Sequence, residues 1–316
     1  MPVTLVQAKL NVTDDIQLGV IDEFRKSHWL MDNLVFDDAV SPVGGGATLT
    51  YGYTRVKTEA GASFRDANEE YVASEAEKER ITVDLKIFGG KYGIDRVLSK
   101  LSGIANEVMF QQSQKIKAAA ALFNDTVING DSAVNAKSFD GLDKALTGSS
   151  TEKTFNVDLS TSAAIDANYK AFLDQLDEFL MGLDGAPSFI GGNTKLIAKI
   201  RACARRVGMY STKANEFGNQ VEYYGSIPLV DFGAKPGTNN PVVAIDGVTG
   251  NTSLYAGRIG IDGFHAVSLS GQAPLYANLP DFSTSGVVKE GDVEMVAAVA
   301  LKATKAAGVA RAIKVQ

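Results

Sequence analysis

The segment FNDTVINGDSAVNAKSFDGLDKAL (residues 123–146) joins a strong helix-stop signal to a short motif further along the chain. Asn129 and Gly130 are residue types that commonly follow the last turn of a helix. Polar and small residues come next, and the motif Phe139-Asp140-Gly141-Leu142 ends that run. The segment has no His, no Cys and no glycine-rich phosphate loop, so we do not interpret it as a catalytic centre. The residues on either side decide what it connects.

The residues before this stop have helical periodicity. Side chains that recur every three or four positions lie on one face of a helix. Those that share a face here are Leu101, Ala105, Val108, Gln112, Ile116, Ala119, Phe123 and Val127. We therefore predict a helix over about residues 104–128, a rod of roughly 37 Å at 1.5 Å per residue.

Two alternating segments precede the helix. Residues 41–46 (SPVGGG) are typical of a turn or loop. In residues 47–57 (ATLTYGYTRVK), which follow, side-chain types alternate as they do in a strand. Residues 80–88 alternate in the same way after a very charged stretch. In the first segment, Leu49, Tyr51, Tyr53 and Arg55 share one face. We predict a long hairpin-like excursion over residues 47–88.

Such an excursion is unusual for a monomer, because an isolated two-stranded hairpin is marginally stable in water. Tyr51, Tyr53 and Phe64 lie within it, and we expect an isolated monomer to leave them largely exposed. Exposed apolar side chains on a projecting element commonly mark a partner site. The sequence therefore predicts that a neighbouring subunit covers this arm.

After the Phe139–Leu142 motif the sequence alternates between strand and helix patterns. We predict helices after the Ser160-Thr161-Ser162 cap and from the Asn193 cap through Val207. Predicted strands cover residues 187–190, 221–224, 228–231, 242–245, 253–259 and 264–269. Residues 293–301 and 309–315 also alternate. The simplest interpretation is a terminal hairpin, although a helix is an alternative because the segment contains many alanines.

Composition describes a packed globular protein. The chain has 316 residues, of which 45% are hydrophobic and 22% charged. A net charge of −6 argues against a protein that binds nucleic acid over its whole surface. The longest uncharged stretch, residues 263–280, contains two prolines and no continuous apolar run, so it does not predict a membrane span. With one cysteine and no secretory signal, we expect a soluble intracellular protein.

The sequence offers few residues for catalysis. His28 stands beside Trp29 and His265 beside Phe264, which favours packed side chains over general bases. Cys203 lies among arginines, which would lower the pKa of an exposed thiol, but a small core residue is the better interpretation. We therefore predict no enzyme activity, no cofactor and no metal site.

Two charged segments remain. Residues 66–80 (DANEEYVASEAEKER) are mostly acidic, and residues 193–206 (NTKLIAKIRACARR) are basic without an acid. They are either two solvated faces or complementary surfaces between subunits. The candidate intersubunit contacts are Tyr51, Tyr53, Phe64, Arg65, Asp66, Glu69, Glu70, Lys195, Lys199, Arg205 and Arg206.

The order of these parts resembles the major capsid proteins of tailed bacteriophages, which have the Hong Kong phage-type capsid fold. The matching segments are ASFRDANEEY (62–71), ITVDLKIFGGKYGIDRVL (81–98), INGD (128–131), FDGL (139–142) and YYGSIPLVD (223–231). Each segment is short, whereas the resemblance in the order of elements covers nearly the whole chain. In this resemblance the segment at 123–146 is the end of a spine helix and the crossing into a second domain.

The resemblance implies an α+β fold in four parts. These are an N-terminal arm (1–40), an extended β-hairpin loop (41–88), a peripheral domain with the spine helix (89–140 and 264–316), and an axial domain with a central mixed sheet (141–263). The extended loop begins at residue 41, which leaves no room for an internal scaffold segment. A separate scaffolding protein is therefore implied.

The resemblance also implies a function. The chain would be the major capsid protein of a tailed double-stranded DNA bacteriophage, assembling with itself into hexamers and pentamers of an icosahedral head. It would form in the host bacterial cytoplasm and reside in the virion. Implied partners are a portal protein, a decoration protein and packaged double-stranded DNA bound without sequence specificity, with no membrane. The alternatives are an encapsulin-type bacterial nanocompartment shell and, from another class, a soluble α+β enzyme with an unrecognised site.

Overall fold

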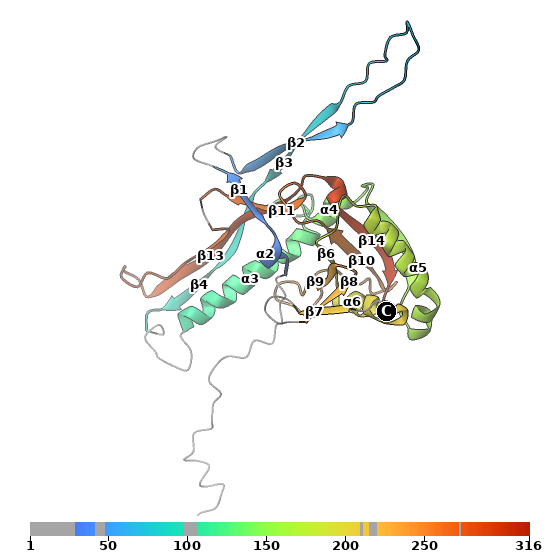
Figure 1. The fold of residues 1–316 in the computed structure, drawn as a ribbon. Coiled ribbons are helices and arrows are strands. Elements are labelled where there is room, and N and C mark those ends of the chain that lie inside the picture. The colour runs from blue at the N-terminus through green and yellow to red at the C-terminus, as the bar shows by residue number, and fades with distance from the viewer. Residues whose placement is uncertain (1–28, 42–47, 98–106, 209–210, 215–219, 272) are drawn as a thin grey trace, which may run out of the picture.

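A computed structural model describes residues 29–41, 48–97, 107–208, 211–214, 220–271 and 273–316. The side chains of residues 211–214, 220 and 221 are not described. Residues 1–28 of the predicted N-terminal arm, with His28, lie outside these ranges, as does the predicted start of the spine helix. The described chain is a mixture of helices and strands in two larger sheets and one separate hairpin (Figure 1).

The first sheet has five strands and is built around β13, the longest strand. Its members are β1 (Phe36–Val40), β4 (Lys86–Asp95), β11 (Phe264–Leu269), β12 (Leu275–Asn278) and β13 (Val288–Leu301). Strand β13 pairs with β4 over residues 288–297 and with β11 over residues 297–301. Every residue from 295 to 300 is buried, as expected for a strand that is covered on both faces.

Helix α3 (Glu107–Asn129) lies along β4 and β13 (Figure 1). It is the predicted spine helix, and its end at Asn129 confirms the helix stop. Its 23 residues make a rod of about 34 Å. Phe123, on the predicted apolar face, is fully buried and stacks against Phe36 and Phe88. The short helix α2 (Trp29–Asn33) packs on the same helix.

The second sheet has seven strands in the order β5-β14-β10-β6-β9-β8-β7. The strands are β5 (Glu152–Asp158), β6 (Phe189–Gly192), β7 (Ser211–Ala214), β8 (Gln220–Tyr224), β9 (Ile227–Asp231), β10 (Asn251–Gly257) and β14 (Ala307–Lys314). Helix α5 (Ser162–Met181) packs on β5, and α6 (Thr194–Val207) packs on β6 and β9. Their apolar faces and this sheet form a core of their own.

Local capping explains where both helices begin. The Thr161 hydroxyl accepts a hydrogen bond from the Ala164 amide at 3.1 Å, and the Asn193 side chain accepts one from the Leu196 amide at 2.9 Å. Both caps confirm the sequence prediction. The predicted strand at residues 242–245 is wrong, because this segment is irregular although Val242 and Val243 are buried.

The predicted terminal hairpin is also wrong. Strand β13 belongs to the five-stranded sheet, whereas β14 lies between β5 and β10 in the seven-stranded sheet. The short 3₁₀ helix η2 (Thr304–Ala306) separates them. Strand β14, which lies in a segment predicted to belong to the peripheral domain, therefore pairs with strands of the predicted axial domain. The domain boundaries themselves stay predictions.

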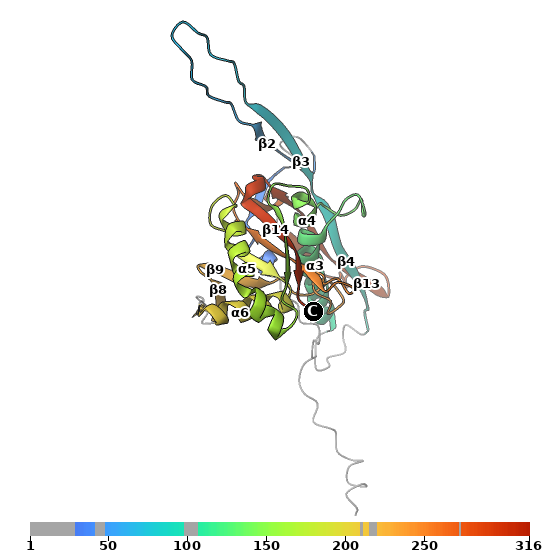
Figure 2. The same cartoon turned by 90° about the vertical axis from the view of Figure 1, so that its right-hand side faces the viewer.

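The excursion before the helix is a hairpin, as predicted. Strands β2 (Thr50–Thr58) and β3 (Glu77–Asp84) pair antiparallel from Thr50 opposite Asp84 to Thr58 opposite Glu77. The paired strands end at Asp84, and residues 86–95 already belong to β4 of the five-stranded sheet. In both views the hairpin projects away from the rest of the molecule (Figures 1 and 2).

The connection at residues 130–141 depends on a close backbone contact between two glycines. The Gly141 amide donates to the Gly130 carbonyl at 2.8 Å, and α4 (Leu142–Leu146) follows directly. A Cβ on Gly141 would lie 2.6 Å from the Thr126 carbonyl oxygen and 2.7 Å from that of Ile128. The helix end and the start of the next unit therefore touch with no room for a side chain.

Gly141→Ala is expected to destabilise the chain by about 1–3 kcal/mol, because overpacking against rigid backbone cannot relax through a side chain. The midpoint of urea unfolding measures this change. Gly247→Ala is the matched control, since a Cβ there meets no heavy atom within 4 Å. Equal unfolding midpoints for the two variants would contradict the close-contact explanation.

Candidate functional site

The tip of the hairpin is the part of the described chain with the most continuous exposure. Every residue from 56 to 78 is exposed. Among them are four large apolar or aromatic side chains, Val56, Phe64, Tyr71 and Val72, and Phe64 is fully exposed. A solvated loop does not need these side chains, so the tip has the composition of a contact surface.

The tip has local structure of its own. The Arg65 guanidinium lies 5.1 Å from the centre of the Tyr71 ring and donates to the carbonyls of Asp66 and Glu69, both at 3.2 Å. The Ser74 hydroxyl accepts a hydrogen bond from the Gly61 amide at 2.8 Å, which links the two legs. Arg65, Asp66 and Glu69 are thus held together next to Phe64, while Glu70 is exposed beside them.

The base of the hairpin is attached to the body. The Tyr51 hydroxyl donates to Asp37 of β1 at 2.7 Å, and the Tyr53 hydroxyl donates to the Leu301 carbonyl of β13 at 2.9 Å. Tyr51 is only 8% exposed. The expectation that Tyr51 and Tyr53 are exposed in a monomer is therefore wrong, because the first part of β2 lies on the body rather than beyond it.

Arg55 extends this attachment toward the tip. Its guanidinium pairs with Glu79 on β3 at 3.1 Å and donates to the Thr304 hydroxyl at 3.1 Å. The alternating pattern places Tyr51, Tyr53 and Arg55 on one face, but their partners Asp37, Leu301 and Thr304 carry no sequence signal that would identify them. Burial and the Asp37 carboxylate raise the pKa of Tyr51, so its hydroxyl stays a donor.

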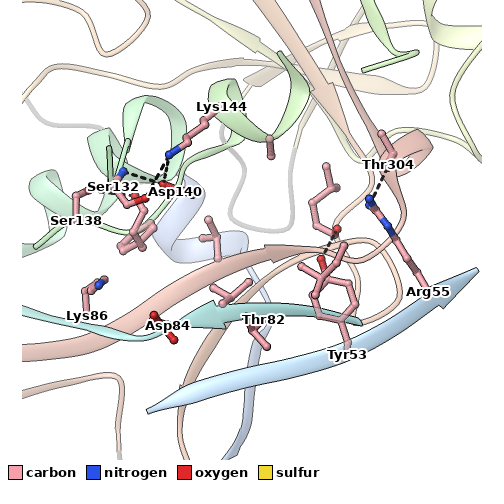
Figure 3. A pocket seen from close by; sticks show the side chains of 16 residues that line it. Tyr53, Arg55, Thr82, Asp84, Lys86, Ser132, Ser138, Asp140, Lys144 and Thr304 are labelled. Atoms are coloured by element: carbon pink, nitrogen blue, oxygen red, sulfur yellow. Dashed lines mark hydrogen bonds and ion pairs between the residues drawn. The ribbon is translucent and has the colours of Figure 1, made fainter. Parts of the chain in front are cut away.

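A cleft of about 430 Å³ lies between the hairpin base and the connection at residues 131–141 (Figure 3). Lys144 points toward Asp140 on its wall and pairs with Asp131 at 2.6 Å and Asp140 at 2.9 Å. The lining includes Tyr53, Arg55, Thr82, Asp84, Lys86, Ser138 and Thr304. Ser132 also lies in the lining and accepts a hydrogen bond from Lys144 at 3.2 Å, but hydrogen bonds to Asp131 and Asp140 raise the pKa of Lys144. Lys144 is therefore held as a cation and cannot act as a base, so the cleft does not have the arrangement of a hydrolytic site.

The basic helix predicted as a contact is α6. Within the chain, Lys195 bonds Gln316, Lys199 donates to the Ser160 carbonyl at 2.6 Å, and Arg206 pairs with Asp166. Arg205 is exposed in the last turn. These intramolecular partners reduce the charge that α6 offers to a neighbour. Its pairing with the acidic leg stays a prediction.

The candidate reactive groups are buried. Cys203 is fully buried in α6, and burial raises the pKa of its thiol to about 11, so the neighbouring cations do not activate it. His265 is fully buried in β11 and is a packed residue, as its sequence context predicted. Within the described ranges, no group of His, Cys, Asp and Glu side chains is arranged to hold a metal ion. No helix in that same part of the chain combines the length and apolarity that crossing a bilayer requires.

No protein-family model matches the chain, and no curated protein matches it in sequence. Solved structures do match over nearly the full length. The holo-SrpI encapsulin complex from Synechococcus elongatus is 15% identical, with 99% of this chain and 97% of that chain covered and a TM-score of 0.67. A structure from Gordonia phage Cozz is 14% identical, with 99% and 96% covered and a TM-score of 0.60.

The capsid of the native GTA particle is 12% identical to this chain, with coverages of 97% and 96% and a TM-score of 0.59. At these identities the likeness concerns the arrangement of elements rather than individual side chains. That arrangement includes the α+β composition and the mixed sheets described above. The chain therefore has the Hong Kong phage-type capsid fold.

Proposed function

We propose that this chain is the subunit of a closed protein shell and that it has no catalytic turnover. The observation that carries the proposal is the projecting hairpin, whose tip exposes Phe64, Tyr71 and Val72 to solvent. A second copy that covered these side chains would remove apolar surface from water, which contributes roughly 1.5–3 kcal/mol for each large side chain that is fully buried. Because every subunit would both give and receive such a contact, the gain repeats around the shell.

Within this class we propose the head of a tailed double-stranded DNA bacteriophage, built from hexamers and pentamers. The net charge of −6 supports this choice, since a strongly basic wall would bind phosphates tightly and hinder the filling of the head. A separate scaffolding protein, a portal protein and a decoration protein are the expected partners. Assembly in the host bacterial cytoplasm and residence in the virion follow from this assignment.

An encapsulin-type nanocompartment is the second candidate. The higher TM-score to the holo-SrpI encapsulin complex, 0.67 against 0.60 for the Gordonia phage structure, favours it. The two candidates differ in what the shell contains, which is double-stranded DNA for a phage head and protein for an encapsulin.

The test is to recover the chain from the cells that produce it, separate particles by sedimentation and image them by negative-stain electron microscopy. Nuclease treatment of the particles, followed by assay of protected nucleic acid, distinguishes the candidates. We expect closed shells that protect double-stranded DNA. Closed shells with protein contents and no protected DNA would support the encapsulin alternative, and a chain that sediments only as a monomer would refute both.

A further inference from the structure

His265 occupies an unusual position beneath the hairpin base. It lies in β11, opposite Ala300 of β13, and its side chain has no exposed surface. Neither ring nitrogen makes a hydrogen bond within the described structure. Buried polar atoms are normally paired, because an unpaired one has lost its hydrogen bonds to water without replacing them. A buried imidazole without partners therefore calls for an explanation other than stability.

The groups around His265 belong to the attachment of the hairpin. The Tyr51 ring of β2 meets the imidazole edge-on, with 5.9 Å between the ring centres. The Asp37 carboxylate of β1, which accepts the Tyr51 hydroxyl at 2.7 Å, lies 4.0 Å from His265 Nε2. Lys302, just after β13, lies 4.0 Å from the same carboxylate oxygen and 5.4 Å from the centre of the Tyr51 ring. Asp262, in the turn before β11, is the other charged group that acts on the imidazole.

We propose that His265 is an acid-sensitive latch that keeps the hairpin base docked on the sheet while neutral and loosens it when protonated. A proton on the imidazole would put a buried cation in the field of Lys302, and the acceptors close to its nitrogens are the Gly263 backbone and the Asp37 carboxylate that Tyr51 already uses. Asp37 is the nearest carboxylate, so the imidazolium would compete with Tyr51 for it. Either the Tyr51–Asp37 hydrogen bond opens or water enters beside Tyr51, and both outcomes loosen the first part of β2.

The direction of the pH effect follows from the environment. Burial lowers the pKa of His265, and the charge of Lys302 lowers it further, although the Gly263 backbone, Asp37 and Asp262 act in the opposite sense. In an undocked, hydrated state the pKa would return toward about 6.5. The undocked state then binds a proton that the docked state does not. Docking is therefore fully favoured above pH 6.5. As the pH falls below 6.5, the equilibrium constant for docking decreases by up to tenfold per pH unit, until the pH reaches the lowered pKa of the docked state.

The other contacts between the hairpin and the body are expected to hold when the Tyr51 contact loosens, so protonation would change the angle of the hairpin rather than detach it. Burial raises the pKa of Tyr53, so its hydrogen bond to the Leu301 carbonyl does not change between pH 5 and 7.5. The hydrogen bond from Arg258 lowers the pKa of Asp262, so this carboxylate stays ionised in the same range. Histidine is thus the side chain at the hairpin base that changes charge near neutral pH. This inference goes beyond the shell proposal, because the latch acts within one chain.

The test measures the angle of the hairpin relative to the body by distances between two spin labels. Ala73→Cys at the tip and Ala167→Cys on α5 are both exposed, and Cys203→Ala removes the natural thiol. Distances are recorded by pulsed electron resonance from pH 7.5 to 5.5 on the full chain diluted with unlabelled chain, so that each signal comes from one subunit. We expect a second distance population that grows below pH 6.5 by up to tenfold per pH unit.

His265→Gln and His265→Met, placed in the labelled chain, are the deciding variants. Both remove the titrating group, one with a polar and one with an apolar side chain of similar size, and circular dichroism checks that each is folded. We expect their distance distributions to be the same at every pH. A labelled chain with His265 that shows no pH response would overturn the proposal, and so would variants that respond as the His265 chain does. Because the measurement reads one subunit, failure of the shell proposal would leave its result unaffected.

Discussion

Replacing residues 60–75 with a short Gly-Ser turn is expected to abolish shell formation while leaving the fold of the chain intact. All the removed residues are exposed, and the deletion keeps the β2–β3 pairing up to Thr58 opposite Glu77. Shortening a loop changes closure entropy by less than about 1 kcal/mol. We expect the melting temperature to change by about 2 °C or less, because about 0.5 kcal/mol is typical of surface changes. Each subunit would nevertheless lose the proposed contact of Phe64 with its neighbour, and this loss would repeat at every interface.

The comparison combines thermal melting with sedimentation and electron microscopy, under conditions that give closed shells of the unchanged chain. Phe64→Ala tests the main side chain alone and should weaken assembly without lowering the melting temperature. Met181→Ala, an exposed apolar residue at the end of α5, is the matched control that should leave assembly unchanged. Closed shells formed by the shortened chain would refute the role of the hairpin tip. A shortened chain that cannot fold would place this segment in the core instead.

Phe123→Ala is expected to have the largest effect on stability, a loss of about 3–5 kcal/mol. The side chain is fully buried at the point where four elements meet. Its ring lies 5.9 Å from that of Phe36 in β1, 6.2 Å from Phe88 in β4 and 6.0 Å from Phe139 in the connection before α4. Removing the ring leaves a cavity that none of these three rigid elements can fill by itself.

Urea unfolding followed by circular dichroism measures the change, with the midpoint and the slope fitted separately. Phe64→Ala provides a control of the same chemistry, because a fully exposed ring contributes little to the folded chain, and its unfolding midpoint should stay within error. A loss below about 1 kcal/mol for Phe123→Ala would show that the core around α3 can collapse into the vacated space. In that case the helix would not be the rigid spine that the packing indicates.

Local chemistry explains why several elements could be predicted from the sequence. The end of α3 at Asn129 and the N-caps Thr161 and Asn193 involve residues within four positions of the helix terminus. The alternating pattern of β2 and β3 identified the hairpin in the same way, because the strand period acts on neighbouring residues. The exposure of Phe64 was predicted from its place on a projecting hairpin. The order of these elements was enough to suggest the capsid fold that the structural matches show.

Pairing between distant segments was decided only by the tertiary structure. The alternating residues of β13 and β14 fit a hairpin equally well, but β13 pairs with β4 and β11 while β14 pairs with β5 and β10. An alternating pattern indicates that one face of a strand is buried, but it does not identify which strand or helix covers that face.

The burial of Tyr51 depends in the same way on Asp37 and on His265, which lies more than two hundred positions away in the sequence. The sequence by itself determined the helix ends, the caps and the projecting hairpin, because each depends on residues a few positions apart. The tertiary structure decided which sheet each strand joins and which part of the hairpin lies on the body, because those choices depend on apolar surfaces that meet only after the chain has folded.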